Sequence, residues 1–273
     1  AQVGVLTALF EAGIEPPGRL VGASVGSLNG AAIASFPSLA GAQMLAQIWL
    51  SDLVHEVFKP QLTRILMSRL RRKTNLLPST PVRRLIERTI HLTGAADFED
   101  LKVPLLVLAT DLTAGRPVVF RSGALTPALL ASTAIPGVYP SVHIDGRDYL
   151  DGGIVENTPI SVAYEEGARE ILAIALMAGA ELDEPPGTWA DVIGRTLQLS
   201  LHHRMLSDFE RLRDRARITI ISPVTPFDAD RIAQSGRLEE MMEGARAATA
   251  RLLQGSGSRL FRRSAIHHLD LRG

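Results

Sequence analysis

Short apolar runs alternate with stretches of helical periodicity along most of the chain. Residues 20–23, 105–109 and 169–177 are nearly continuous apolar runs, which are typical of strands in a sheet covered on both faces. Further strands are expected at 117–120 and 218–221, a hairpin at 142–150, and helices at 1–13, 42–58, 126–134, 158–167, 188–215 and 238–253. Strands that alternate with helices in this way predict an α/β fold, a three-layer α/β/α sandwich with a mainly parallel central sheet.

The most informative stretch is Leu-Val-Gly-Ala-Ser-Val-Gly-Ser-Leu-Asn-Gly at residues 20–30. Gly22, Ser24 and Gly26 form a Gly-x-Ser-x-Gly element between an expected strand and an expected helix. In such a nucleophile elbow the Ser occupies a strained turn, and the glycines leave room for the neighbouring backbone. The helix N-terminus would favour negative charge on or beside the Ser oxygen. A turn whose Ser only caps the helix is the alternative, and a phosphate-binding loop is disfavoured because its Gly-Lys-Ser/Thr is absent.

Length and composition narrow the class of protein. The 273 residues suffice for one large α/β domain, which we expect to cover residues 1–254, followed by a loose tail at 255–273. The formal net charge of zero gives no reason to expect nucleic acid as a partner. The chain has no cysteine, which excludes disulfides, thiolate metal sites and a Cys nucleophile. Its longest apolar run, 171–180, is too short to span a bilayer.

A basic amphipathic segment covers residues 61–93, where leucines and isoleucines alternate with many arginines. Such a segment could lie on an anionic membrane surface or cover an apolar substrate pocket as a lid. The alternative is the solvated outer face of a helical pair.

A nucleophilic Ser needs a base within hydrogen-bond reach. None of the seven histidines follows an apolar strand with turn residues, so a Ser-His-Asp triad finds little support. Asp151 is a better candidate, because it ends an expected strand and is followed by Gly152 and Gly153, which let the backbone turn and approach closely. Burial beside an apolar pocket would raise its proton affinity. An ordinary Asp-Gly-Gly turn is the alternative, and Asp111, also at a strand end, is the rival acid.

Two motifs together resemble the patatin-like phospholipases: Gly-Ala-Ser-Val-Gly-Ser-Leu-Asn-Gly at 22–30 and Asp-Gly-Gly at 151–153. Ala-Ser-Thr-Ala-Ile-Pro-Gly-Val-Tyr-Pro at 131–140 and Asn-Thr-Pro-Ile at 157–160 also resemble bacterial members of that family, and the likeness extends over roughly residues 1–180. The resemblance implies that Ser24 is the nucleophile and Asp151 the base. The sequence starts just after the position of the family's glycine-rich oxyanion loop and its preceding strand, so we expect a fragment with impaired activity.

The resemblance implies a serine acyl hydrolase that cleaves carboxylic esters of lipids, such as phospholipids or lysophospholipids, through an acyl-enzyme. No metal or organic cofactor is expected, because Ser, Asp, hydrogen-bond donors and water suffice and no His/carboxylate cluster has metal-ligand spacing. A lipid ester is the expected partner, with a cytoplasmic location and peripheral membrane contact. The alternatives are a non-catalytic lipid-binding or regulatory protein on the same fold, and an acyltransferase; Ala23 stands where such transferases generally carry a His.

Overall fold

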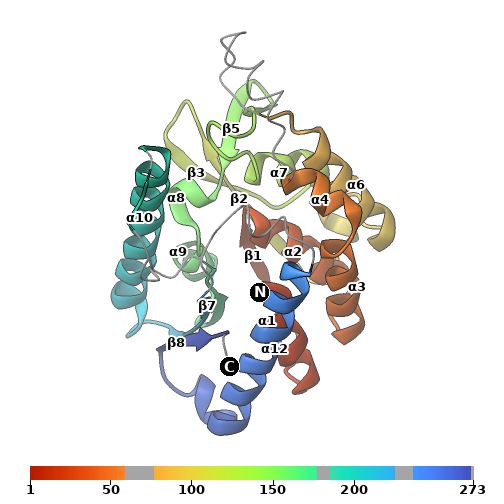
Figure 1. Cartoon of the computed structure of the whole chain (residues 1–273). Coiled ribbons are helices and arrows are strands. Elements are labelled where there is room, and N and C mark those ends of the chain that lie inside the picture. The colour runs from red at the N-terminus through yellow and green to blue at the C-terminus, as the bar shows by residue number, and fades with distance from the viewer. Residues whose placement is uncertain (59–76, 177–184, 188, 225–235, 272–273) are drawn as a thin grey trace. The chain divides into compact units, whose positions relative to one another are not determined.

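The structure is a computed structural model that describes residues 1–58, 77–176, 185–187, 189–224 and 236–271 (Figure 1). The chain divides into two compact units. One consists of residues 15–155, and the other combines residues 1–14 with residues 156–273. Each unit has its own sheet.

The unit of residues 15–155 contains a mixed five-stranded sheet. Its strands are β1 (Leu20–Ala23), β2 (Leu105–Asp111), β3 (Arg116–Phe120), β4 (Val142–Ile144) and β5 (Arg147–Asp151). Strand β1 pairs with β2 in parallel, whereas β3 and β5 pair with β2 in antiparallel register and β4 pairs with β5. The expected hairpin is confirmed, because β4 and β5 are joined by Asp145 and Gly146, both at positive φ.

Strand β2 is buried along its whole length, as its continuous apolar run predicts. The helices of this unit are α2 (Val25–Ser35), α3 (Leu39–Trp49), α4 (Asp52–Phe58), α6 (Thr80–Thr93), α7 (Leu125–Ser132) and the short α8 (Gly153–Glu156) at its end, with a 3₁₀ turn, η1 (Phe98–Asp100). Side chains of α2, α6 and α7 form one apolar core with β2, including Ala31, Ile86 and Leu129. The single helix expected over 42–58 is two helices, since α3 ends at Trp49 and α4 begins at Asp52.

Only part of the basic segment 61–93 can be compared with its prediction, because residues 59–76 lie outside the described residues. Residues 80–93 form α6, whose Val82 and Ile86 are buried in the core of the unit. This helix is therefore amphipathic as predicted, while a lid role for the segment stays a prediction.

The other unit has helices on both faces of a parallel sheet. Its elements are α1 (Gln2–Glu11), α9 (Ile160–Glu165), β6 (Glu170–Ile174), α10 (Trp189–Leu212), β7 (Arg217–Val224), α12 (Arg237–Ser256), η2 (Gly257–Phe261) and β8 (Ala265–Asp270). Strand β7 pairs in parallel with β6 on one side and β8 on the other. Apolar residues of α9 and α10 pack with Ile218 and Ile220 of β7, and those of α1 and α12 pack with Ile221. This is the α/β/α layering expected from the sequence.

The C-terminal stretch differs from its prediction. Residues 257–270 were expected to be part of a loose tail, yet they form η2 and β8. Leu269 of β8 is buried against α1 and α12, and Ile266 packs against residues of α10 and β7. The strand is held by its ladder with β7, which is a long-range interaction that a short, His-containing run does not reveal.

Candidate active site

Ser24 occupies a strained elbow between β1 and α2. Its backbone angles are φ 52° and ψ −130°, a region that is essentially restricted to glycine and costs on the order of 1–3 kcal/mol. The Ser24 N–H donates to Ser132 Oγ at 3.0 Å, and its carbonyl accepts the Ser27 hydroxyl at 2.6 Å. The Ser27 N–H also donates to that carbonyl, at 2.9 Å. These bonds fix the strained conformation, and the positive end of the α2 dipole adjoins the Ser24 side chain.

Gly22 is required by the close return of α2 past β1. A Cβ at Gly22 would lie 2.5 Å from the Gly26 carbonyl oxygen and 2.7 Å from Ser27 Cα. Both contacts are far inside van der Waals distance, so the backbone would have to shift. The absence of a side chain at Gly22 thus allows the close packing of β1 on α2 beside Ser24, while a nucleophilic role for Ser24 stays a prediction.

Two strands that meet on one edge of β2 bring Ser24 and Asp151 together. Strand β3 covers one edge of β2, so β1 and β5 share the other: β1 pairs with its first half and β5 with its second. Strand β1 runs parallel and ends opposite Leu108, whereas β5 runs antiparallel and ends opposite Ala109. The two strands therefore point at each other, and the residues that follow or end them, Ser24 and Asp151, converge.

The Ser24 hydroxyl donates a hydrogen bond of 2.6 Å to Asp151 Oδ2. The other carboxylate oxygen, Oδ1, accepts the Gly153 N–H at 2.7 Å. The backbone of Asp151 is also held, because its N–H donates to the Ala134 carbonyl at 3.0 Å and its carbonyl accepts the Thr110 hydroxyl at 2.8 Å. The carboxylate therefore points at the Ser24 hydroxyl in a fixed orientation.

Gly152 lets the chain turn directly against β2. A Cβ at this position would lie 2.1 Å from the Leu108 carbonyl oxygen, a distance that no side chain could adopt without displacing the backbone. Gly153 contributes the N–H that binds Asp151 Oδ1. The Asp-Gly-Gly sequence is thus a tight turn that positions a carboxylate.

Burial raises the pKa of the Asp151 carboxyl to about 6, from an ordinary value of 3.8. Asp151 is only 5% exposed, and loss of contact with water disfavours the charged form of its carboxyl group. The hydrogen bonds from Ser24 and the Gly153 N–H oppose this shift without cancelling it. The carboxylate is therefore ionised at neutral pH but more basic than an exposed aspartate.

The rival acid, Asp111, is committed to other partners. Its Oδ1 accepts the Thr113 and Ala114 N–H groups, and its Oδ2 accepts Arg147 at 2.8 Å. The Ala114 N–H, with Arg147 and the Thr113 N–H, lowers the pKa of this carboxyl against the opposing effect of burial. Asp111 thus closes the turn between β2 and β3 and pairs with Arg147 of β5.

The histidines do not enter this site in the part of the chain that the structure describes. The hydrogen bonds of the Ser24 and Asp151 side chains run to each other and to the Gly153 N–H. Among the described residues there is also no group of three or more His, Asp or Glu side chains placed to hold a metal ion. Nor does any described helix have the length and apolar character needed to cross a membrane.

Ser132 is a site residue that the sequence did not single out by itself. Its fully buried hydroxyl donates to the Leu108 carbonyl at 2.6 Å and accepts the Ser24 N–H, so one side chain ties α7 to β2 and to the elbow. In the sequence, the stretch 131–140 is informative only through its resemblance to the family. A buried Ser at the end of an apolar helix was the available signal.

The part of the chain that carries this site also matches a known protein family. The family model described as "Patatin-like phospholipase" matches residues 1–164, which is more than half of the chain. The chain belongs to the patatin-like phospholipase family. Its expected α/β/α fold class is confirmed by this membership and by the layered, partly parallel sheets described above.

Several curated proteins are similar to this member of the family. An uncharacterized NTE family protein of Mycobacterium bovis is 29% identical over 201 residues, which cover 72% of this chain and 52% of the relative. Patatin-like phospholipase domain-containing protein 7 of Rattus norvegicus is 30% identical over 191 residues, or 67% of this chain and 13% of the relative. Neuropathy target esterase sws of Drosophila melanogaster is 32% identical over 177 residues, which cover 64% of this chain and 12% of the relative. The chain thus spans about half the length of the mycobacterial relative and far less of the animal ones.

Proposed function

We propose that this chain is a serine acyl hydrolase that cleaves carboxylic ester bonds of lipids through a Ser24–Asp151 dyad. The observation that carries the proposal is the 2.6 Å hydrogen bond from a strained elbow Ser to a buried carboxylate. A structural Ser has no need of that backbone strain, because a relaxed turn could cap α2 equally well. Backbone strain and a perturbed buried acid at one place are typical of functional sites.

In the first half-reaction, Ser24 Oγ attacks the ester carbonyl carbon while Asp151 Oδ2 takes the hydroxyl proton. The N-terminal end of α2 favours the negative charge that develops on the carbonyl oxygen. When the carbon–oxygen bond to the leaving alcohol breaks, the proton on Asp151 passes to that alcohol. The acyl group is then esterified to Ser24, and Asp151 is again ionised.

In the second half-reaction, water attacks the acyl carbon and gives a proton to Asp151. The bond between the acyl carbon and Ser24 Oγ then breaks, Ser24 regains the proton, and the carboxylic acid leaves. Both steps require a base that is ionised at working pH yet proton-avid, and the raised pKa of Asp151, about 6, suits this role.

The surroundings of the dyad favour an apolar acyl substrate. Ile135 is 42% exposed and follows Ala134, whose carbonyl holds the Asp151 N–H. Ile154 is 38% exposed and follows Gly153, whose N–H binds the carboxylate. Two large aliphatic side chains therefore flank the Asp turn while open to solvent, where an acyl chain could cover them. With the family match, this supports phospholipids or lysophospholipids as substrates.

The test is hydrolysis of para-nitrophenyl acyl esters by the full-length protein and its Ser24→Ala and Asp151→Asn variants. We expect each variant to lose at least about a thousandfold in kcat/KM while remaining folded, as for other enzymes stripped of one member of a catalytic unit. Matched controls are Ser35→Ala, a buried Ser on the same helix that donates to the Ala31 carbonyl, and Asp111→Asn, the acid bound to Arg147. Both controls should retain activity.

A fluorophosphonate probe gives a second readout that does not depend on turnover. It should label the Ser24 peptide in the wild-type protein and leave Ser24→Ala unlabelled. Vesicles of phosphatidylcholine and micelles of lysophosphatidylcholine then rank the lipid esters. A protein inactive toward all these esters would favour a non-catalytic lipid-binding role, and loss of activity in Asp111→Asn alone would make Asp111 the base.

A further inference from the structure

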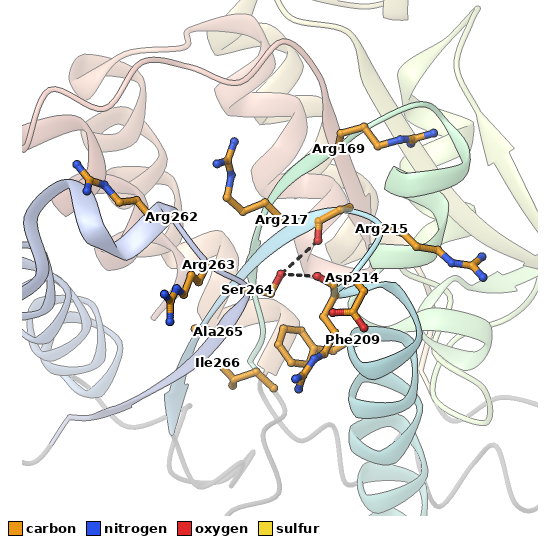
Figure 2. Close-up of a pocket in the computed structure, with 12 residues that line it drawn as sticks. Arg169, Phe209, Asp214, Arg215, Arg217, Arg262, Arg263, Ser264, Ala265 and Ile266 are labelled. Carbon is orange, nitrogen blue, oxygen red and sulfur yellow. Dashed lines mark hydrogen bonds between the residues drawn. The ribbon is translucent and has the colours of Figure 1, made fainter.

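A hollow lined by arginines lies in the unit formed by residues 1–14 and 156–273. It has a volume of about 850 Å³ and is open to solvent (Figure 2). It forms where the three parallel strands begin, since Arg169 precedes β6, Arg217 starts β7 and Ser264 precedes β8. We call this feature the arginine hollow. Its arginines are Arg169, Arg213, Arg215, Arg217, Arg262 and Arg263.

The arginine hollow concentrates positive charge in a chain whose formal net charge is zero. Asp214 is the one acidic residue among its lining residues. Some of the positive charge is paired, because Arg213 forms an ion pair with Glu210 at 3.1 Å and Arg217 forms one with Glu170. The hollow therefore keeps an excess of positive charge after Asp214 and these pairs are counted.

Three arginines of the hollow have no carboxylate partner among the described residues, so no ion pair neutralises their charge. The guanidinium groups of Arg215 and Arg263 belong to exposed residues and make no hydrogen bond or ion pair with any described residue. Arg169 stacks on the Tyr164 ring at 4.4 Å and donates to the Tyr164 and Ala168 carbonyls, which hold the guanidinium without neutralising it. These groups are available to an anion.

The floor of the hollow is preorganised by Ser264. Its hydroxyl lies 3.0 Å from the Arg213 carbonyl and 3.2 Å from the Ala216 carbonyl, and it accepts the Ile218 N–H at 3.1 Å. The loop that carries Arg213 and Arg215 is thereby fastened to the start of β8. Arginine side chains on a fixed backbone lose less entropy when they bind a ligand than those on a loose loop would.

The labelled arginines are spread around Ser264 and do not point at one spot (Figure 2). A single small ion would contact only one or two of them, whereas a ligand with several anionic groups could reach more. Guanidinium groups bind phosphate oxygens in bidentate geometry and stay charged at all physiological pH values. The volume lies in the range of small-molecule sites.

We propose that the arginine hollow binds a ligand that carries several phosphate groups, either a soluble polyphosphorylated molecule or clustered headgroups of anionic phospholipids. The site shares no residue with the Ser24–Asp151 pair, so the proposal does not depend on the catalytic one. The chemistry common to both sources is phosphate bound by guanidinium, and the experiment separates them.

The test compares wild-type protein with Arg215→Ala/Arg263→Ala for two probes at about 0.1 M salt. The soluble probe is inositol hexakisphosphate, measured by calorimetry, and the lipid probe is phosphatidylglycerol vesicles beside neutral phosphatidylcholine vesicles, measured by sedimentation. We expect the double variant to bind the soluble probe about tenfold more weakly. For vesicles, loss of two surface arginines should weaken binding on the order of thirtyfold.

The matched control is Arg116→Ala/Arg251→Ala, which removes two exposed arginines that have no side-chain partner among the described residues. This control should bind both probes like the wild type, and thermal unfolding checks that each variant is folded. Binding to vesicles alone would identify lipid headgroups as the source, and binding to inositol hexakisphosphate alone a soluble ligand. The proposal would be overturned if the wild-type protein bound neither probe, or if the control variant bound them as weakly as Arg215→Ala/Arg263→Ala.

Discussion

The Ser24 hydroxyl and the Asp151 carboxylate adjust each other through one hydrogen bond. Burial raises the pKa of Asp151, and the bond from Ser24 lowers it, so the balance sets a value of about 6. A more exposed carboxylate would be a weaker base, and a buried one without the Ser24 donor would hold its proton at still higher pH. The pair is thus tuned by two opposed effects on a single group.

A pH profile follows from this balance. The proposed base acts only when ionised, so kcat/KM should be constant well above pH 6 and fall as the pH drops through about 6, tenfold for each further unit. The measurement is para-nitrophenyl ester hydrolysis between about pH 4.5 and 8, with thermal unfolding followed at each pH to exclude denaturation. An acidic limb centred near the ordinary aspartate value, about 4, would contradict a buried Asp151 base.

At the scale of elements, the site depends on how β1 and β5 share one edge of β2. The strands end opposite Leu108 and Ala109, and this adjacency brings together residues far apart in the sequence. The Leu108 carbonyl is the common anchor, since it accepts the Ser132 hydroxyl and leaves no room for a side chain at Gly152. Small changes at this point of β2 should therefore shift both residues of the proposed dyad.

Substitution of Gly152 by Ala tests this anchor. Its Cβ would lie 2.1 Å from the Leu108 carbonyl oxygen, so the Asp turn has to move away from β2. A displacement of about 1 Å at a reacting group can cost on the order of a hundredfold in rate, which we expect in kcat/KM for para-nitrophenyl esters. Gly18→Ala is the matched control, because no heavy atom lies within 4 Å of its Cβ position. Equal activity of the two variants would show that the tight turn is dispensable.

The elbow and the Asp turn could be predicted because each depends on residues adjacent in the sequence. Gly22, Ser24 and Gly26 specify the first, and Asp151 with Gly152 specifies the second. Their meeting depends on the register of β5 on β2, which the sequence does not reveal. The strand-end position of Asp151 made it a candidate partner for Ser24, and the family resemblance favoured it over an ordinary Asp-Gly-Gly turn and over Asp111. The role of Ser132 and the strand at 265–270 depend on partners far away along the chain, and short local patterns carry no signal for such pairings.

At the scale of the whole molecule, the chain folds into two units that are built from the sequence in different ways. Residues 15–155 form one unit from a continuous stretch, whereas the other unit is assembled from both ends of the sequence. Within that second unit, α1 packs closely on α12, and a Cβ at Gly4 would lie 2.0 Å from the Met242 carbonyl oxygen. The two helices can approach this closely because Gly4 has no side chain.

Gly4→Ala should therefore destabilise this unit. The added methyl group cannot fit without separating α1 from α12, and overpacking of this kind costs about 1–3 kcal/mol or more. We expect a lower melting temperature and faster amide hydrogen exchange in α1 and α12. Gly255→Ala, on α12 but with no atom within 4 Å of its Cβ position, should leave both quantities nearly unchanged. Unchanged exchange in Gly4→Ala would show that α1 tolerates a looser contact.

The pairing of α1 with α12 also has a consequence during translation. The ribosome makes α1 before α12, and roughly 225 residues separate the end of α1 from the start of α12. At about 5–20 residues per second, the apolar side of α1, with Val5 and Leu9, waits about 10–45 s before its partner helix exists. Throughout that interval the nascent chain exposes an apolar helix face that has no partner helix, and exposed apolar surface of this kind is what makes incompletely folded chains prone to aggregate.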